Sequence, residues 1–289
     1  MNGALAVARY TVVELTRRRI LLVFVIIGAL GTLALGFGLK ILYTVAGSGV
    51  IAGTQDPARL QKFLELSFVS YLYGALGIFA LLIAFAVGMT AIYHDLDSGA
   101  AVSIFSKPVT RFAYAAGKIG AAAVTLVVIV SVLAVEARIV MLLFPGGLSS
   151  SLTGEVVATI ANSVLVMVLV LALTTWMNNI IAATVAFIYY DVITGVIGSV
   201  HTLVHSNGYE NALVQGIFDV LYWVVPHPLI SSAPGDLVRA QLALSNARSG
   251  EQTLALIPSA SGPGDVAWWA FLVLLLCALC YFAVRRRQV

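Results

Sequence analysis

Long runs of apolar residues divide the chain into six segments, each long enough to cross a lipid bilayer as a helix. The hydrocarbon core of a bilayer is about 30 Å thick, and about 20 helical residues cross it. The six runs are 20–43, 68–93, 116–144, 156–177, 180–203 and 266–284. This pattern predicts an all-α integral membrane protein with six transmembrane helices in a single transmembrane domain, 1–289.

Two further helices are expected outside these runs. Residues 1–19 predict an amphipathic interfacial helix, because apolar residues at helical spacing form one stripe beside basic positions. The stripe consists of Leu5, Ala8, Val12 and Leu15. An external segment, 204–265, contains an apolar stretch from Ala212 to Val225 that is too short to span and is ended by Pro226 and Pro228. We expect that stretch to be a helix that lies on the outer leaflet or dips into it.

The composition excludes a soluble protein of this size. Hydrophobic residues make up 61% of the 289 residues and charged residues only 10%, against about 25% charged residues in an average soluble domain. A chain of this length has too little interior to bury so much apolar surface without a bilayer. The net charge of +3 does not indicate a nucleic-acid partner, since the basic residues sit at helix ends and form no patch with interleaved aromatic residues.

The placement of lysine and arginine predicts the orientation, because cytoplasmic loops are enriched in both. With the amino terminus inside, the cytoplasmic segments are 1–19, 94–115, the turn near Asn178 and 285–289. They hold ten Lys and Arg residues, counting the flanking Lys118, whereas the opposite side holds four. We therefore expect a multi-pass protein of the cell membrane, plasma or inner, with both termini in the cytoplasm.

Motifs that bind phosphate or perform catalysis are missing from the sequence. The pair Gly117-Lys118 fails the phosphate-binding pattern, because Phe112 stands where the first glycine is needed and Ile119 where Ser or Thr must follow the lysine. We therefore expect no catalytic residue, no ATPase motif and no cofactor in this chain.

His201 and His205 are the candidates for metal ligands. They stand at i and i+4, a spacing that puts two imidazoles on one helix face. The sequence shows no evident third ligand, and interfacial histidines without a metal are the commoner case, so we expect no metal there.

Charged residues inside the predicted spans are costly, and Asp191, Glu136 and Arg138 are the ones that lie away from the span ends. Asp191 lies near the middle of 180–203, whereas Glu136 and Arg138 lie in the outer third of 116–144. Two residues apart on a helix, Glu136 and Arg138 do not share a face. We expect Asp191 to have a polar partner, with Arg138 as the leading candidate. A polar site that contacts substrate and a proton relay are the functional alternatives.

The loop 94–115 is the most informative stretch. Asp97 or Ser98 can cap a short helix, and Pro108 must end that helix at or before Lys107. The helix would expose three apolar side chains to the cytoplasm, Val102, Ile104 and Phe105. Apolar residues on so short an exposed helix indicate a partner surface.

Three motifs in and around this loop share a family resemblance. They are Asp97-x-Gly99, Ser106-Lys107-Pro108-Val109-Thr110-Arg111 and Tyr114-x-x-Gly117-Lys118. With the amphipathic start before Arg17-Arg18-Arg19, the six spans and the external excursion before the last span, they resemble type-2 ABC transporter permeases over essentially the whole chain. One departure is Ala100, where many relatives have threonine.

The resemblance implies a membrane subunit whose ATPase is a separate polypeptide. Such permeases form homodimers or related heterodimers, and each places a cytoplasmic coupling helix, here 97–107, in a groove of one of two ATPase subunits that bind ATP and Mg. The residues implied in this contact are Asp97, Gly99, Val102, Ile104, Phe105, Ser106, Lys107, Pro108 and Arg111. Closure of the ATPase pair would drive substrate across the membrane, usually outward.

Two other classes of function stay open at the sequence level. A secondary carrier working alone would show inverted repeats, and none is visible. A membrane-embedded enzyme acting on lipid would need His, Asp or Ser clustered at one interface, and here these residues are scattered.

Overall fold

The computed structural model describes residues 2–17, 19–51, 57–97, 109–142, 150–206, 211–233, 235–236, 239 and 260–286. Within these ranges every regular element is a helix and no strand occurs. The elements in chain order are α1 (Asn2–Arg17), α2 (Arg19–Ile51), α3 (Pro57–Ala91), α4 (Tyr93–Asp97), α6 (Arg111–Met141), α7 (Ser150–Thr174), α8 (Asn179–Phe187), the π-helix η1 (Ile188–Ile193), α9 (Thr194–Ser206), α10 (Ala212–Val224) and α13 (Pro263–Arg286). The predicted all-α class is confirmed.

Six helical segments among the described residues are long and apolar enough to cross a membrane. They are Leu21–Ile41, Ser70–Asp95, Arg111–Met141, Thr153–Thr174, Asn179–His205 and Pro263–Arg286. Each overlaps one predicted run, so the prediction of six long apolar helices is confirmed. The third span begins at Arg111 rather than 116, because the Thr110 hydroxyl accepts a hydrogen bond from the Ala113 amide and caps the helix there.

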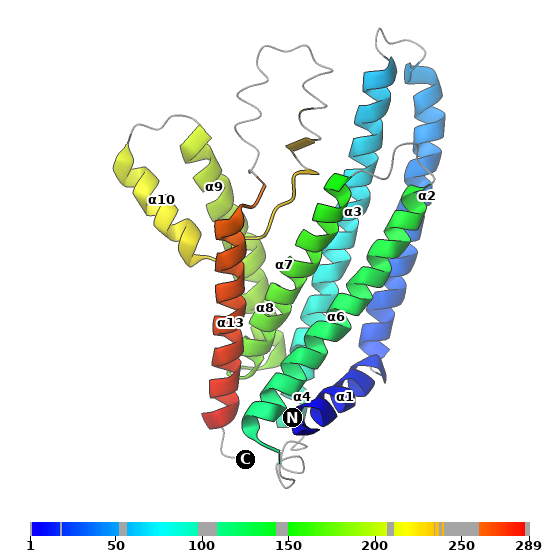
Figure 1. The fold of residues 1–289 in the computed structure, drawn as a ribbon. Helices are drawn as coiled ribbons and strands as arrows, with labels where there is room; N and C mark the ends of the chain where they lie inside the picture. The colour runs from blue at the N-terminus through cyan, green and yellow to red at the C-terminus, as the bar shows by residue number, and fades with distance from the viewer. Residues whose placement is uncertain are drawn as a thin grey trace.

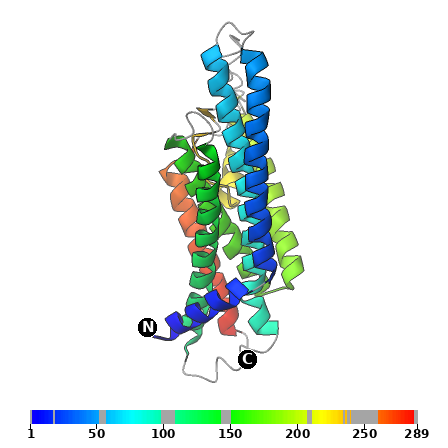
Figure 2. The same ribbon diagram turned by 90° about the vertical axis from the view of Figure 1, so that its right-hand side faces the viewer.

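The long helices stand side by side, and α3 and α7 lie against each other in the middle of the bundle (Figures 1 and 2). Their contact is close at Gly88 of α3. A Cβ atom at that position would lie 2.8 Å from the carbonyl oxygen of Met167 and 2.9 Å from the Cβ of Val170. Small residues at such crossings let membrane helices approach each other. Gly88 therefore sets the distance between the two central helices.

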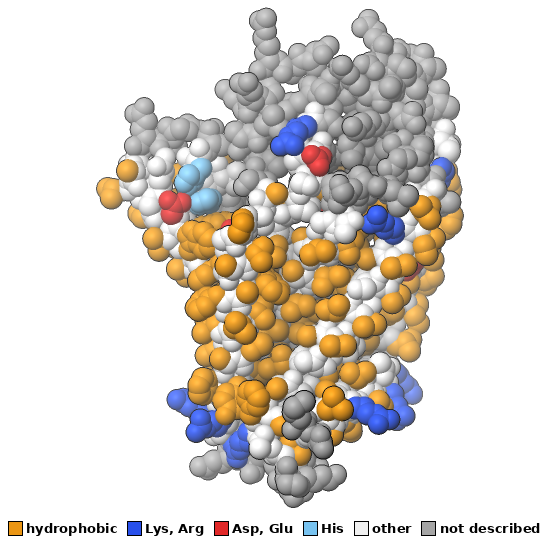
Figure 3. Space-filling model, viewed as in Figure 1, with side chains coloured by type: hydrophobic (Ala, Val, Ile, Leu, Met, Phe, Trp, Pro, Cys, Tyr) orange, Lys and Arg blue, Asp and Glu red, His pale blue; other side chains and the backbone are white. Residues whose placement is uncertain are grey.

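The outer surface of the bundle is apolar across its middle. On α6, five aliphatic side chains at helical spacing are each 55–60% exposed: Val124, Val128, Val132, Val135 and Ile139. Figure 3 shows hydrophobic side chains covering the middle of the bundle on the face in view, with Lys and Arg gathered at its lower end. Soluble monomeric proteins rarely expose so large an apolar surface. Lipid chains solvate such a surface, as expected of a multi-pass membrane protein.

Both chain termini lie at that lower end (Figure 1), which we call the basic end. Its described arginines belong to α1 and to the ends of α2, α6 and α13: Arg9, Arg17, Arg19, Arg111, Arg285 and Arg286. Helix α1 lies across the basic end at a steep angle to the spans (Figure 2) and packs mainly against α6.

The apolar residues of the predicted stripe do not share one environment in α1. Leu15 is buried, as are Val7 and Thr11, whereas Leu5 is 76% exposed. Val7 packs against Gly117 of α6. That α1 lies at the membrane interface stays a prediction.

Candidate functional site

The predicted coupling helix falls largely outside the described residues. Asp97 is the last residue of α4, and α6 begins at Arg111, so the structure describes both flanks of the loop. The predicted contact residues between them, Gly99, Val102, Ile104, Phe105, Ser106, Lys107 and Pro108, lie outside the described ranges. The two flanks meet at the basic end of the bundle, where they take part in one buried polar cluster.

That cluster, the Lys118 junction, consists of Lys118 and Tyr114 of α6, Asp95 of α4 and Glu14 of α1. The Lys118 side chain is fully buried, and its Nζ lies 2.8 Å from Asp95 Oδ2 and 3.0 Å from Glu14 Oε2. The Tyr114 hydroxyl donates a hydrogen bond of 3.0 Å to the same Asp95 oxygen. Buried charges persist only when paired and hydrogen-bonded. The junction therefore holds three helices in one fixed arrangement.

Gly117 lets α1 reach this junction. A Cβ atom at Gly117 would lie 2.7 Å from the carbonyl oxygen of Ala4 and 3.0 Å from the Cβ of Val7. Any larger residue would push α1 away from α6 and separate Glu14 from Lys118. The motif Tyr114-x-x-Gly117-Lys118 thus has a structural reason: all three residues bind the ends of the loop to the amino-terminal helix.

Arg111, the remaining predicted contact residue, makes a contact that the sequence did not predict. Its Nη1 donates hydrogen bonds to the carbonyl oxygens of Arg285, at 2.7 Å, and Val284, at 3.4 Å. The last carbonyls of a helix have no partner within the helix, so Arg111 caps the end of α13. The start of the third span is thereby tied to the end of the sixth.

The predicted pairing of Asp191 with Arg138 is wrong. Arg138 donates a hydrogen bond of 3.2 Å to the Thr153 hydroxyl of α7, the helix that packs beside it. Asp191 lies in η1, and its buried Oδ2 has no hydrogen-bond partner among the described residues. The same holds for Glu136 Oε1. The sequence placed Asp191 correctly in the fifth span but could not show which helix faces it.

Asp191 instead lines a polar cavity of about 300 Å³ between α3, α7 and η1. The hydroxyl groups of Tyr73 and Tyr190, which also line it, are buried and have no hydrogen-bond partner among the described residues. Glu155 lines the cavity too and accepts a hydrogen bond from Ser231. A π-helical segment of this kind often marks a functional site. The charged groups of the described lining are carboxylates, so the cavity suits hydrogen-bond donors or a cation.

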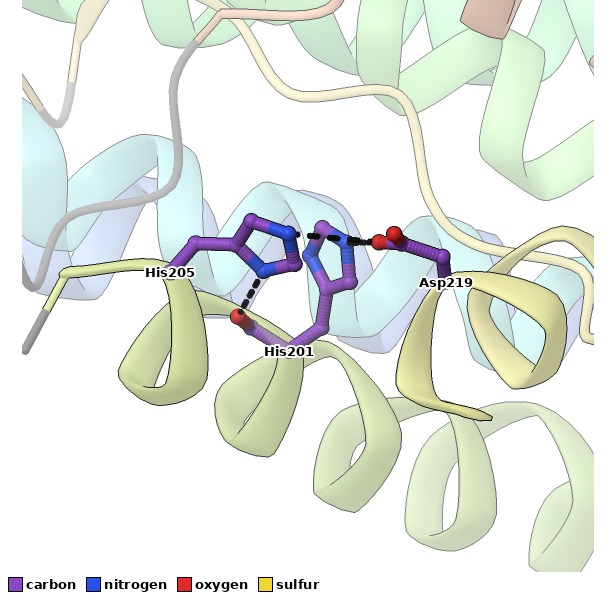
Figure 4. Close-up of side chains that lie close together, drawn as sticks. All are labelled: His201, His205 and Asp219. Carbon is purple, nitrogen blue, oxygen red and sulfur yellow. Dashed lines mark hydrogen bonds and ion pairs between the residues drawn. The ribbon is translucent and has the colours of Figure 1, made fainter. Parts of the chain in front are cut away.

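A second polar group lies where α9 meets α10, toward the end opposite the basic end. His201 and His205 of α9 point toward Asp219 of α10 (Figure 4). Asp219 Oδ1 lies 3.0 Å from His201 Nε2 and 3.3 Å from His205 Nε2. Asp219 is the third potential ligand that the sequence did not reveal, because it lies on a separate helix 18 residues from His201.

An aromatic stack continues from this group. The ring of Tyr222 lies between those of His201 and His227, with centroid distances of 4.4 and 4.2 Å. His227 Nε2 lies 3.3 Å from Asp265 Oδ1. Burial, and then the negative charge of Asp265, raise the pKa of Tyr222 to about 12. The stack lines a cavity of about 640 Å³, which no sequence pattern predicted.

The chain was also compared with known proteins. No protein-family model matches the sequence, and no curated protein matches it.

Proposed function

We propose that this chain is the membrane-spanning permease subunit of an ATP-binding-cassette exporter. The chain pairs with a second permease copy, identical or related, and with two ATPase subunits that bind ATP and Mg. Both termini and the basic end face the cytoplasm of the cell membrane. The chain itself hydrolyses nothing; it converts movement of the ATPases into movement of its spans.

The observation that supports this proposal most strongly is the Lys118 junction. It joins the two flanks of the loop 98–108 to each other and to α1, through Asp95, Lys118 and Glu14. A partner that pulls on the loop therefore pulls at once on the second span, the third span and the amino-terminal helix. A loop attached by flexible chain would lose that motion before it reached the bundle. The buried ion pairs give the loop a rigid base.

The arginine cap on α13 extends this connection. Arg111 lies just after the loop and binds the carbonyl end of the sixth span. Displacement of the loop thus reaches both the third and the sixth spans, while the apolar faces of the bundle can slide in lipid. This arrangement is suited to transmitting a stroke from outside the membrane.

The polar cavity at Asp191 favours a second candidate, a proton-coupled secondary carrier. Intramembrane acids often belong to proton relays, and Asp191 lacks a partner among the described residues. A carrier of this kind needs no ATPase bound to the loop 98–108, so a test for a bound ATPase distinguishes the two candidates.

The test is affinity purification of the tagged chain from its native membranes in mild detergent, followed by identification of bound proteins. We expect a polypeptide with a phosphate-binding P-loop to co-purify. Phe105→Ala should reduce its recovery strongly, because a central aromatic residue at an interface often contributes about 2 kcal/mol or more. Phe112→Ala is the matched control, since that exposed phenylalanine contacts Tyr281 of its own chain. Absence of any ATPase with the unaltered chain would contradict the proposal and favour the carrier.

A further inference from the structure

We propose that His201, His205 and Asp219 form a binding site for a divalent transition-metal ion of the zinc class. The three ligand atoms come from two helices and all lie within 4.8 Å of one another. The inference rests on these side chains alone and is independent of how the protein transports its substrate.

The distances suit such an ion. A tetrahedral Zn²⁺ ion with bonds of about 2.0–2.1 Å holds its ligand atoms roughly 3.3 Å apart. Asp219 Oδ1 lies 3.0 Å from His201 Nε2 and 3.3 Å from His205 Nε2. The three ligand atoms lie within 4.8 Å of one another, so side-chain rotation can bring them around one ion. Three protein ligands leave a fourth position for water or another group.

The hydrogen bond behind His205 fixes which ring nitrogen is available. His205 Nδ1 lies 2.9 Å from the carbonyl oxygen of His201. A carbonyl only accepts, so Nδ1 is the protonated nitrogen and donates to it. In the neutral ring, Nε2 then holds a lone pair directed at the Asp219 carboxylate. Histidines that bind metals commonly donate their other N–H to a carbonyl in this way.

Without a metal, both contacts with Asp219 need a proton on each Nε2. His205 must then be an imidazolium, because its Nδ1 already donates to a carbonyl. The ring centroids of His201 and His205 are only 4.3 Å apart, so two imidazolium rings would repel each other at close range. A divalent ion accepts both lone pairs and the carboxylate at once. Nitrogen ligands favour Zn²⁺, Co²⁺, Ni²⁺ or Cu²⁺ over Mg²⁺ and Ca²⁺, which prefer oxygen.

The site is open enough to load. The side chains of His205 and Asp219 are 42% and 48% exposed, and that of His201 is 25% exposed. A bound ion would fasten α10 to α9. His201 also lines the cavity of about 640 Å³, so the ion would lie at the edge of that cavity.

The experiment measures metal binding by the full chain, purified in detergent with an affinity tag that contains no histidine. Zn²⁺ affinity is obtained by competition with a chromophoric chelator, and Co²⁺ is added as a spectroscopic probe of the ligands. We expect one bound ion per chain and a Co²⁺ absorption typical of nitrogen and oxygen ligands. His201→Ala, His205→Ala and Asp219→Asn should each lower the affinity by at least about 10- to 100-fold, the loss seen even for second-shell changes.

His227→Ala and Asp265→Asn are matched controls, because they remove the same chemical groups from the neighbouring pair, and His94→Ala removes the remaining histidine. These variants should keep the affinity. Zn²⁺ should also raise the melting temperature of the unaltered chain but not that of Asp219→Asn. A cooperative melting transition of Asp219→Asn without Zn²⁺ checks that the variant is folded. The inference is overturned if the chain binds no Zn²⁺, or if affinity follows His227 or His94 instead.

Discussion

Lys118→Met removes the ammonium group of the Lys118 junction but keeps a long, unbranched side chain of similar reach. Asp95, whose side chain is 2% exposed, then loses its ion pair with Lys118 and keeps its hydrogen bond from Tyr114. Glu14, 16% exposed, also loses its ion pair with Lys118. Removing one partner of a buried ion pair costs about 3–5 kcal/mol, because a buried charge is left uncompensated. We expect a loss of that size in the free energy of unfolding, measured in detergent.

The reasoning also predicts a rescue. Replacing buried ion pairs with neutral groups of similar volume is often close to neutral for stability. The triple variant Lys118→Met, Asp95→Asn, Glu14→Gln should therefore recover most of the loss. Arg19→Met, an exposed residue at the same end, is the control and should change stability little. If Lys118→Met unfolds at the same temperature as the unaltered chain, the junction does not hold the three helices as we argue.

Three further predictions concern other parts of the bundle. Gly88→Ala should destabilise the protein by about 1–3 kcal/mol through overpacking against Met167 and Val170. Gly77→Ala, the control, should not, because the space at its Cβ position is open. Equal melting temperatures for the two variants would contradict the close contact at Gly88. Asp191→Asn should fold at least as well as the unaltered chain, because a buried charge costs at least ~2.5 kcal/mol in a membrane and no described partner is lost; a clear drop in melting temperature would reveal one. Cysteines replacing Ser48 and Ser259 should react with an impermeant reagent from outside intact cells, and those replacing Ser103 and Gln288 only after permeabilisation; labelling of positions 259 and 288 from the same side would overturn the orientation.

The spans could be predicted from local sequence, with ends that differ by a few residues from those of the structure. Apolar runs of this length have no stable alternative to a membrane helix, and local signals set their boundaries. Asn178 accepts a hydrogen bond from the Ile180 amide at the turn between the fourth and fifth spans, as the tight turn predicted there requires. Helix α10 ends at Val224, just before Pro226, because proline cannot continue it.

The polar contacts could not be predicted, since each depends on residues brought together by packing. Lys118 is separated from Glu14 by 104 residues, and its burial reverses the usual expectation for a lysine at a helix end. Arg138 donates its hydrogen bond to Thr153 because α7 packs beside α6. The hydrophobic periodicity of the sequence does not show which helices are neighbours. The third ligand of the histidine pair was hidden for the same reason, as Asp219 lies on another helix.

The most direct test of the central claim is photo-crosslinking from the loop itself. A photoreactive amino acid replaces Ile104 in the full chain, and native membranes are irradiated before the crosslinked product is identified. We predict a product that joins the chain to a polypeptide with the P-loop pattern of an ATPase, and that the same amino acid placed at Val132, on the exposed apolar face of α6, gives none. Crosslinks from position 104 only to lipid, or only to this chain, would contradict the account.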